Sequence, residues 1–269
     1  MSNPAFGSNP VFADPVKRRG EASVSPATLD AMYGAPSATP VQTNRMTYDD
    51  VIVKTGGLLA LLAIVAAITW QLTDTMPGLY LVGLGVGFVL ALVNIFKKTP
   101  SPALITAYAV AEGVFLGGLS AILDSVYPGI AMQALIATVV TAGVTLALFT
   151  SGKVRVTPKA TKIFLVAMIG YAVFSLVNLG MMLFGATDSA WGMRSDITIG
   201  GMPLGVVIGA LAVVLAAYSL VMDFDSIKRG VESGAPRIFS WSAAFGLIVT
   251  LVWLYTEFLR IFALLSGRD

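Results

Sequence analysis

The 269-residue sequence contains no cysteine and no histidine. Without these side chains the protein cannot form disulfides, thiolate nucleophiles, Cys/His zinc sites or a Ser-His catalytic dyad. Charged residues are also scarce, because they make up 12% of the chain, about half of the usual share in soluble proteins. Proton chemistry must therefore depend on carboxylates, lysine or tyrosine. The net charge of +2 is too small and too dispersed to predict nucleic-acid binding.

Apolar residues, by contrast, make up 56% of the chain, and the mean hydropathy is +0.82. Seven apolar stretches have the length of roughly 20 residues that an α-helix needs to cross a bilayer core of about 30 Å. They do not alternate every second residue, as the strands of a membrane barrel would. The sequence predicts an all-α, polytopic membrane helix bundle over residues 47–269. The seven transmembrane helices are expected at about 51–72, 79–96, 103–123, 130–149, 163–184, 202–222 and 241–265.

Residues 1–46 differ from the rest, because Pro, Ser, Asn and Ala dominate and no long apolar stretch occurs. This composition predicts a disordered cytoplasmic tail. A secretory signal is not expected, since the basic cluster Lys17-Arg18-Arg19 is not followed by an apolar region.

Lysine and arginine gather in alternate loops, and such residues are retained on the cytoplasmic side. Of the opposite loops, only one carries a cation, Arg194. We therefore expect a multi-pass protein of the cell inner (plasma) membrane, with a cytoplasmic amino terminus and a carboxyl terminus outside. The cytoplasmic cations are Lys97, Lys98, Lys153, Arg155, Lys159, Lys162, Lys228, Arg229 and Arg237.

Glycines recur every four residues in the third span, at Gly113 and Gly117, and near the start of the sixth, at Gly201, Gly205 and Gly209. This spacing lets helix backbones approach closely in a membrane. It predicts that both spans lie inside the bundle.

Ionisable residues within a membrane are costly and are candidates for function. Glu112 lies tenth in the third span, near the bilayer midplane, where it would serve ion or proton passage or form an interhelical hydrogen bond as a neutral acid. Glu257 and Arg260 are three residues apart on one helix face and could form an ion pair. Asp223 and Asp225 close the predicted sixth span at its inner end. Their side chains should point to different sides of the helix, one toward the bundle and one toward water.

Several classes of seven-helix protein are excluded. The last span has no lysine for a retinal Schiff base, and the chain has no Gly-x-Gly-Asp turn of an intramembrane aspartyl protease. A phosphate-binding glycine-rich loop with Lys-Ser/Thr is also missing. We therefore expect neither an enzyme nor a protein with a cofactor.

Two segments, Met222-Asp223-Phe224-Asp225-Ser226-Ile227 and Leu254-Tyr255-Thr256-Glu257-Phe258-Leu259-Arg260-Ile261-Phe262, resemble the transmembrane Bax-inhibitor-motif family. The tail and the loop Gly234-Ala235-Pro236-Arg237 are similar to a bacterial branch of it, the Bax inhibitor-1-like membrane proteins. The likeness extends over about residues 45–269.

This resemblance implies a bundle whose last helix is central, and a pH-sensitive calcium leak. In the family, an Asp on the sixth helix and an Asp on the seventh share a proton and close the pore at low pH. Phe224-Asp225-Ser226 is similar to the family's aromatic-Asp-Thr string, which makes Asp225 the first carboxylate. Leu254-Tyr255-Thr256-Glu257 is similar to its Leu-Tyr-x-Asp pattern, which makes Glu257 the second.

The sequence departs from the family pattern at the second carboxylate. Glu replaces Asp, and Arg260 three residues later would hold Glu257 ionised and compete with a shared proton. If the last helix begins at Trp241, Glu257 lies about 24 Å from its inner end, whereas Asp225 lies at the inner edge. The two can meet only if this helix begins below the membrane or if Asp225 lies deeper.

Our hypothesis from the sequence is that Asp225 and Glu257, with Asp223 or Glu112 in support and Arg260 beside them, line a cation pathway. Carboxylate oxygens are ligands of the type that calcium takes, so Asp225 is the candidate calcium site. Two alternatives stay open: a proton-coupled transporter, and a non-transporting regulator that binds a membrane protease or another membrane protein.

Overall fold

The computed structural model describes residues 43–187, 189 and 191–267, and most of the predicted tail, up to residue 42, lies outside this range. Residues from Asn44 onward form one compact unit. Seven helices in the described residues are long and apolar enough to cross a membrane, which confirms the predicted fold class. They are α3 (Tyr48–Leu72), α4 (Leu79–Phe96), α5 (Pro102–Val126), α6 (Ile130–Thr150), α7 (Pro158–Leu183), α9 (Leu204–Glu232) and α10 (Phe239–Ser266).

The helix starts follow from local sequence. Pro102 and Pro158 occupy the first turns of α5 and α7, where the missing N–H costs no hydrogen bond. Thr157 caps α7 by accepting a hydrogen bond from the Ala160 amide (3.2 Å). Thr47 caps α3 in the same way through Asp50 (3.1 Å), so two N-caps of the preferred residue type fix these boundaries.

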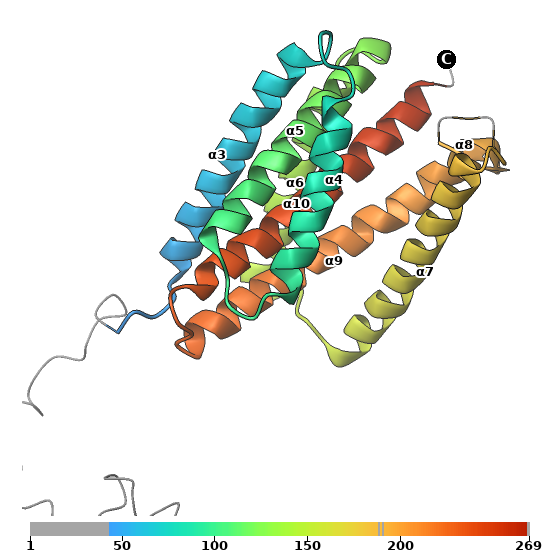
Figure 1. The fold of residues 1–269 in the computed structure, drawn as a ribbon. Coiled ribbons are helices and arrows are strands. Elements are labelled where there is room, and N and C mark those ends of the chain that lie inside the picture. The colour runs from blue at the N-terminus through green and yellow to red at the C-terminus, as the bar shows by residue number, and fades with distance from the viewer. Residues whose placement is uncertain (1–42, 188, 190, 268–269) are drawn as a thin grey trace, which may run out of the picture. The chain divides into compact units, whose positions relative to one another are not determined.

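The last helix, α10, is central, as the family resemblance implies. It contacts α3, α5, α6 and α9, and it runs between them in Figure 1. In the most apolar stretch of each helix, about half of the residues of α5 and α10 are buried, against 6% of those of α7. Helix α7 lies at the edge of the bundle beside α9 in Figure 1. Most of the α7 surface therefore faces the surroundings.

Glycines bring the interior helices together. A Cβ atom at Gly113 of α5 would lie 2.8 Å from the Leu62 carbonyl of α3. A Cβ at Gly117 of α5 would overlap the backbone of Ala66, which also lies on α3. On α9, a Cβ at Gly209 would lie 2.5 Å from Ile261 of α10. The prediction that the third and sixth spans pack closely inside the bundle is confirmed.

Helix α9 is longer than the predicted span, because it continues to Glu232 instead of ending at residue 222. Ion pairs four residues apart support the extension, between Arg229 and Asp225 and between Lys228 and Glu232 (3.8 Å). The helix ends just before Gly234, whose φ of 68° suits glycine. Asp223 and Asp225, which were predicted to close the membrane span, therefore lie within the helix and not at its end. Loss of hydropathy marks the end of an apolar stretch, but it does not end a helix.

A short helix and a hairpin connect α7 to α9. Helix α8 (Met193–Asp196) is followed by the antiparallel strands β1 (Thr198–Ile199) and β2 (Met202–Pro203). Gly200 and Gly201 form the turn with positive φ angles of 59° and 80°, as tight hairpins require. Gly201 thus lies in a turn and not in the sixth span.

Residues 44–46, predicted as part of the tail, pair with the loop between α9 and α10. The Met46 amide donates to the Ala235 carbonyl (2.8 Å), and the Arg237 amide donates to the Asn44 carbonyl (2.9 Å). The Arg237 side chain forms an ion pair with Asp50 (2.8 Å), and this carboxylate raises the pKa of the guanidinium above its ordinary value. The start of α3 is therefore fastened to the start of α10.

Candidate functional site

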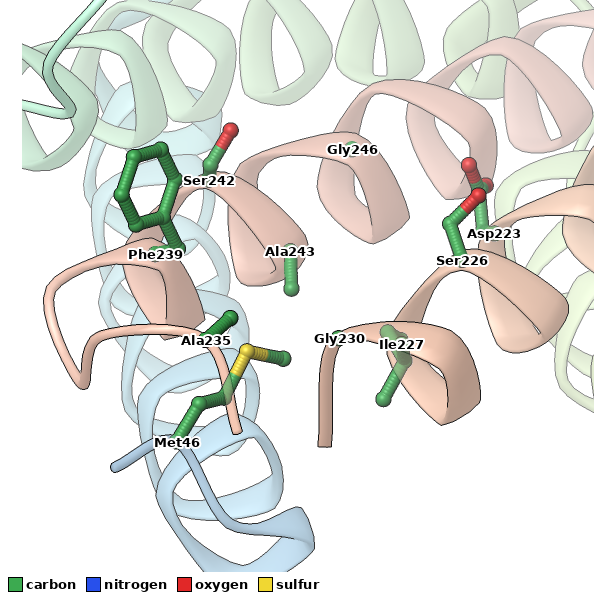
Figure 2. A pocket seen from close by; sticks show the side chains of 10 residues that line it. All are labelled: Met46, Asp223, Ser226, Ile227, Gly230, Ala235, Phe239, Ser242, Ala243 and Gly246. Atoms are coloured by element: carbon green, nitrogen blue, oxygen red, sulfur yellow. The ribbon is translucent and has the colours of Figure 1, made fainter. Parts of the chain in front are cut away.

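A cavity of about 310 Å³ lies between the end of α9 and the start of α10. Among the described residues, Asp223 is the only charged one that lines it, and its Oδ2 atom accepts a hydrogen bond from Thr250 of α10 (2.7 Å). A Cβ at Gly246, one turn before Thr250, would lie 3.6 Å from the other carboxylate oxygen. Figure 2 shows Asp223 and Ser226 at one side of the cavity and Met46 at the other. The cavity thus combines one carboxylate with mostly apolar walls.

Met46 reaches this cavity from the segment before α3. It is 4% exposed, and its sulfur would lie 3.4 Å from a Cβ at Gly230 of α9. The absence of a side chain at Gly230 therefore makes room for Met46. The side chain lines one side of the cavity (Figure 2), and sequence reasoning missed it because residues 1–46 had the composition of a uniform tail.

Asp225 faces away from the cavity. Its carboxylate forms an ion pair with Arg229 one turn later, and the Arg229 side chain is 66% exposed. The prediction that the two aspartates point to different sides is confirmed. The structure assigns the interior position to Asp223.

Glu257 is 1% exposed and has three polar partners. It forms an ion pair with Arg260 one turn later on α10, which confirms the predicted local pairing. Tyr171 of α7 donates its hydroxyl to the carboxylate, and Trp253 donates its indole N–H (3.1 Å). The Arg260 guanidinium also donates to the Tyr171 hydroxyl (3.1 Å).

Arg194 of α8 joins the same region, although the sequence singled it out only as the lone cation of the outer loops. It is 4% exposed and donates to Ser175 of α7 (2.8 Å). Its guanidinium carbon lies 5.5 Å from the ring centre of Tyr171. Together Tyr171, Arg194, Glu257 and Arg260 form what we call the outer cluster. In the sequence, this cluster could have been suspected only from Arg194, an isolated loop cation, and from Tyr171 in the middle of the preceding span.

Asp225 and Glu257 are not brought together, so the pairing that the resemblance implies is absent from this structure. Glu257 lies opposite Gly209, since a Cβ there would be 3.9 Å from its Oε2 atom. Gly209 is fourteen residues before Asp223 on α9, or about 21 Å along the helix. The two helices are antiparallel, so residues late in α9 meet residues early in α10.

The space between Asp223 and Glu257 is packed. Leu220 of α9 and Leu254 of α10 lie between the two carboxylates along their helices, belong to one core cluster, and are at most 1% exposed. A cavity with a carboxylate thus occupies one end of the α9–α10 interface, and a charged cluster occupies the other. A packed apolar segment thus separates the cavity from the cluster.

Glu112 lies elsewhere, at the interface of α4 and α5. Its Oε1 atom would lie 3.0 Å from a Cβ at Gly87 of α4. Tyr108, one turn earlier on α5, interacts with the carboxyl through a hydrogen bond, and its ring packs on Phe245 of α10 (5.0 Å). Glu112 does not line the cavity, and its hydrogen-bond partner Tyr108 lies on its own helix, α5, and not on a neighbouring one.

Among the described residues, no group of three or more acids, histidines or cysteines could hold a metal ion. Asp225, the predicted calcium site, has its carboxylate engaged by Arg229. Any divalent cation in the cavity would meet one carboxylate and neighbouring hydroxyl groups, which suits brief contact more than tight binding.

Comparison with known proteins identifies the chain. A family model described as Bax inhibitor 1 like matches residues 3–267, and no curated protein gives a match. The match agrees with the seven helices and with the central last helix. This integral membrane protein belongs to the Bax inhibitor 1-like family.

Proposed function

We propose that the protein is a pH-sensitive calcium leak whose cytoplasmic half is the cavity that ends at Asp223. One observation supports this proposal. The cavity lies between α9 and α10, the two helices that carry the family's motifs, and the Asp223 carboxylate lines it at the end that is farther from the α9–α10 loop. Calcium prefers oxygen ligands, and the hydroxyl groups of Ser226 and Ser242 line the cavity with Asp223. Asp223 thereby takes the role that the sequence gave to Asp225.

The order of the helices and the charges of the loops support a cytoplasmic position for the cavity. Because seven helices cross the membrane, the start of α3 and the end of α10 lie on opposite sides. The loops rich in Lys and Arg follow α4, α6 and α9. These loops share one side with the start of α3 and with the cavity. Because cations are retained in the cytoplasm, the cavity opens to the cytoplasm and the outer cluster lies toward the outside of the plasma membrane.

Opening requires two changes in this conformation. The packed segment around Leu220 and Leu254 must separate, and a cation must then pass the outer cluster, where the ion pair of Glu257 and Arg260 must part. A protonated Asp223 would offer no charge to calcium, whereas the ionised form would attract it. We therefore expect the leak to decrease as the pH falls.

Calcium flux into indicator-loaded liposomes tests the proposal. Asp223→Asn should lower the flux about tenfold or more and flatten its pH dependence, because it removes the one charge that the described residues give to the cavity. Asp225→Asn is the matched control, since it changes the same side chain on the same helix but outside the cavity, and its flux should stay within about twofold. Glu257→Gln should also change the flux.

The reverse pattern, with Asp225→Asn inactive and Asp223→Asn normal, would overturn the assignment of Asp223. Wild-type liposomes without calcium flux would overturn the leak itself. A substrate flux that needs a pH gradient would then indicate a proton-coupled transporter. Cross-linking of a membrane protease or another membrane protein in cells would indicate a regulator.

A further inference from the structure

Buried polar atoms without a hydrogen-bond partner are concentrated at one end of the described bundle. Five such side-chain atoms occur in the described residues. Only Thr55 Oγ1 lies elsewhere, while Asn178 Oδ1, Thr187 Oγ1, Arg194 Nη1 and Arg260 Nε lie in the last turns of α7 and α10 or in the connection to α9. Since buried polar groups are almost always paired, this end of the protein is built around an interaction beyond its own side chains.

Arg194 gives the strongest indication of the missing partner. It is 96% buried, given its exposed fraction of 4%, and one terminal nitrogen donates to Ser175 while the other, Nη1, has no acceptor among the described residues. Aromatic rings of Tyr171 and Phe174 lie 5.5 and 5.4 Å from its guanidinium carbon. A guanidinium has five donors and no acceptor, so only a group with negative charge or lone pairs can complete it.

The charges of the outer cluster do not balance. Arg260 shares the carboxylate of Glu257, whereas Arg194 forms no ion pair with any acid of the described residues. Both guanidinium groups adjoin Tyr171, one at its hydroxyl (3.1 Å) and one at its ring. The cluster thus holds two cations and one anion in a buried place, where an uncompensated charge is strongly unfavourable.

We propose that the outer cluster binds one small monovalent anion of the chloride type, held by the free N–H groups of Arg194 and Arg260. An anion satisfies both donors and neutralises the surplus charge. The aromatic walls and the burial of Arg194 favour a compact halide over a carboxylate-bearing molecule. The inference rests on the cluster alone and holds whether or not the protein conducts calcium.

Thermal unfolding of the purified full-length protein in detergent tests the proposal. Chloride or bromide titrated against gluconate at constant ionic strength should raise the midpoint with the logarithm of the halide concentration above Kd, by about 5–10 °C at a concentration about a hundredfold above Kd. Arg194→Gln should abolish the halide effect, and Arg194→Lys should weaken the apparent affinity about tenfold because the fork of donors is lost. Arg237→Gln removes an exposed guanidinium and should leave the response unchanged.

A crystal of the wild-type protein grown in bromide gives a second measurement that needs no variant. We expect an anomalous peak between Arg194 and Arg260. Equal midpoints in chloride and gluconate would overturn the proposal and indicate that water alone completes these donors. A full halide response in Arg194→Gln would also overturn it, because the halide would then bind at another site.

Discussion

Replacing Glu257 by Gln should destabilise the protein strongly, because it leaves Arg260 buried without its counter-charge. Gln keeps a side-chain oxygen for the hydrogen bonds from Tyr171 and Trp253, so the change mainly removes charge. Glu257 is 1% exposed and the Arg260 side chain 17%. Breaking a buried ion pair of this kind costs about 3–5 kcal/mol. For a domain of this size, that cost corresponds to a fall in the thermal midpoint of about 6–20 °C.

The exposed pair of Asp225 and Arg229 provides the matched control. It also joins two residues one turn apart on one helix, but its side chains are 23% and 66% exposed. Water and salt screen such pairs, so Asp225→Asn should cost no more than about 0.5 kcal/mol. Both variants differ from the wild type by one carboxylate replaced by its amide. The difference between them therefore measures burial.

Thermal unfolding in detergent, followed by intrinsic tryptophan fluorescence, measures both costs. The double variant Glu257→Gln with Arg260→Met removes the uncompensated cation and should recover most of the lost stability. Equal midpoints for Glu257→Gln and Asp225→Asn would refute the buried ion pair. A double variant that is less stable than Glu257→Gln would refute the charge explanation.

Three further predictions concern packing, the cavity and topology. Gly117→Ala should destabilise the bundle by about 1–3 kcal/mol in thermal unfolding, since its Cβ would overlap the backbone of α3. Gly143→Ala on α6, where a Cβ meets open space, should instead be neutral or stabilising by up to about 1 kcal/mol; equal effects would argue against close packing at Gly117. Met46→Ala should raise calcium flux in liposomes by widening the cavity that Met46 lines, and an unchanged flux would mean that Met46 does not limit the passage of calcium. Because the chain has no cysteine, Ser125→Cys and Ser233→Cys each create a unique thiol. An impermeant maleimide applied to intact cells should label only the first, and the opposite result would invert the topology.

The helices could be predicted from the sequence, because apolar stretches and N-terminal prolines and caps depend only on residues that are neighbours along the chain. The length of each apolar stretch predicted the seven spans, and prolines and threonines mark several starts. The ion pair of Glu257 and Arg260 was also predictable, since residues three apart on a helix lie on one face. The end of α9 was missed because the helix continues past its apolar part through charged residues that pair with one another.

Contacts between distant segments could not be predicted in this way. The tail prediction included residues 44–46, yet Met46 is buried against α9. Arg194 appeared as a loop cation, yet α8 brings it back to Tyr171 inside the bundle. In both cases the partner lies far along the chain, and no local pattern of hydropathy or charge reports it.

The sequence by itself determined that this protein spans a membrane with seven helices and that very few ionisable residues lie within them, because the cost of charge in lipid acts on each segment separately. Only the tertiary structure decided which of these residues meet. The rotation of α9 against α10 turns Asp223 inward and Asp225 outward, and the antiparallel course of the two helices keeps both aspartates far from Glu257. Such rotation and depth arise from side-chain packing between helices, and a single helix has no means of specifying them.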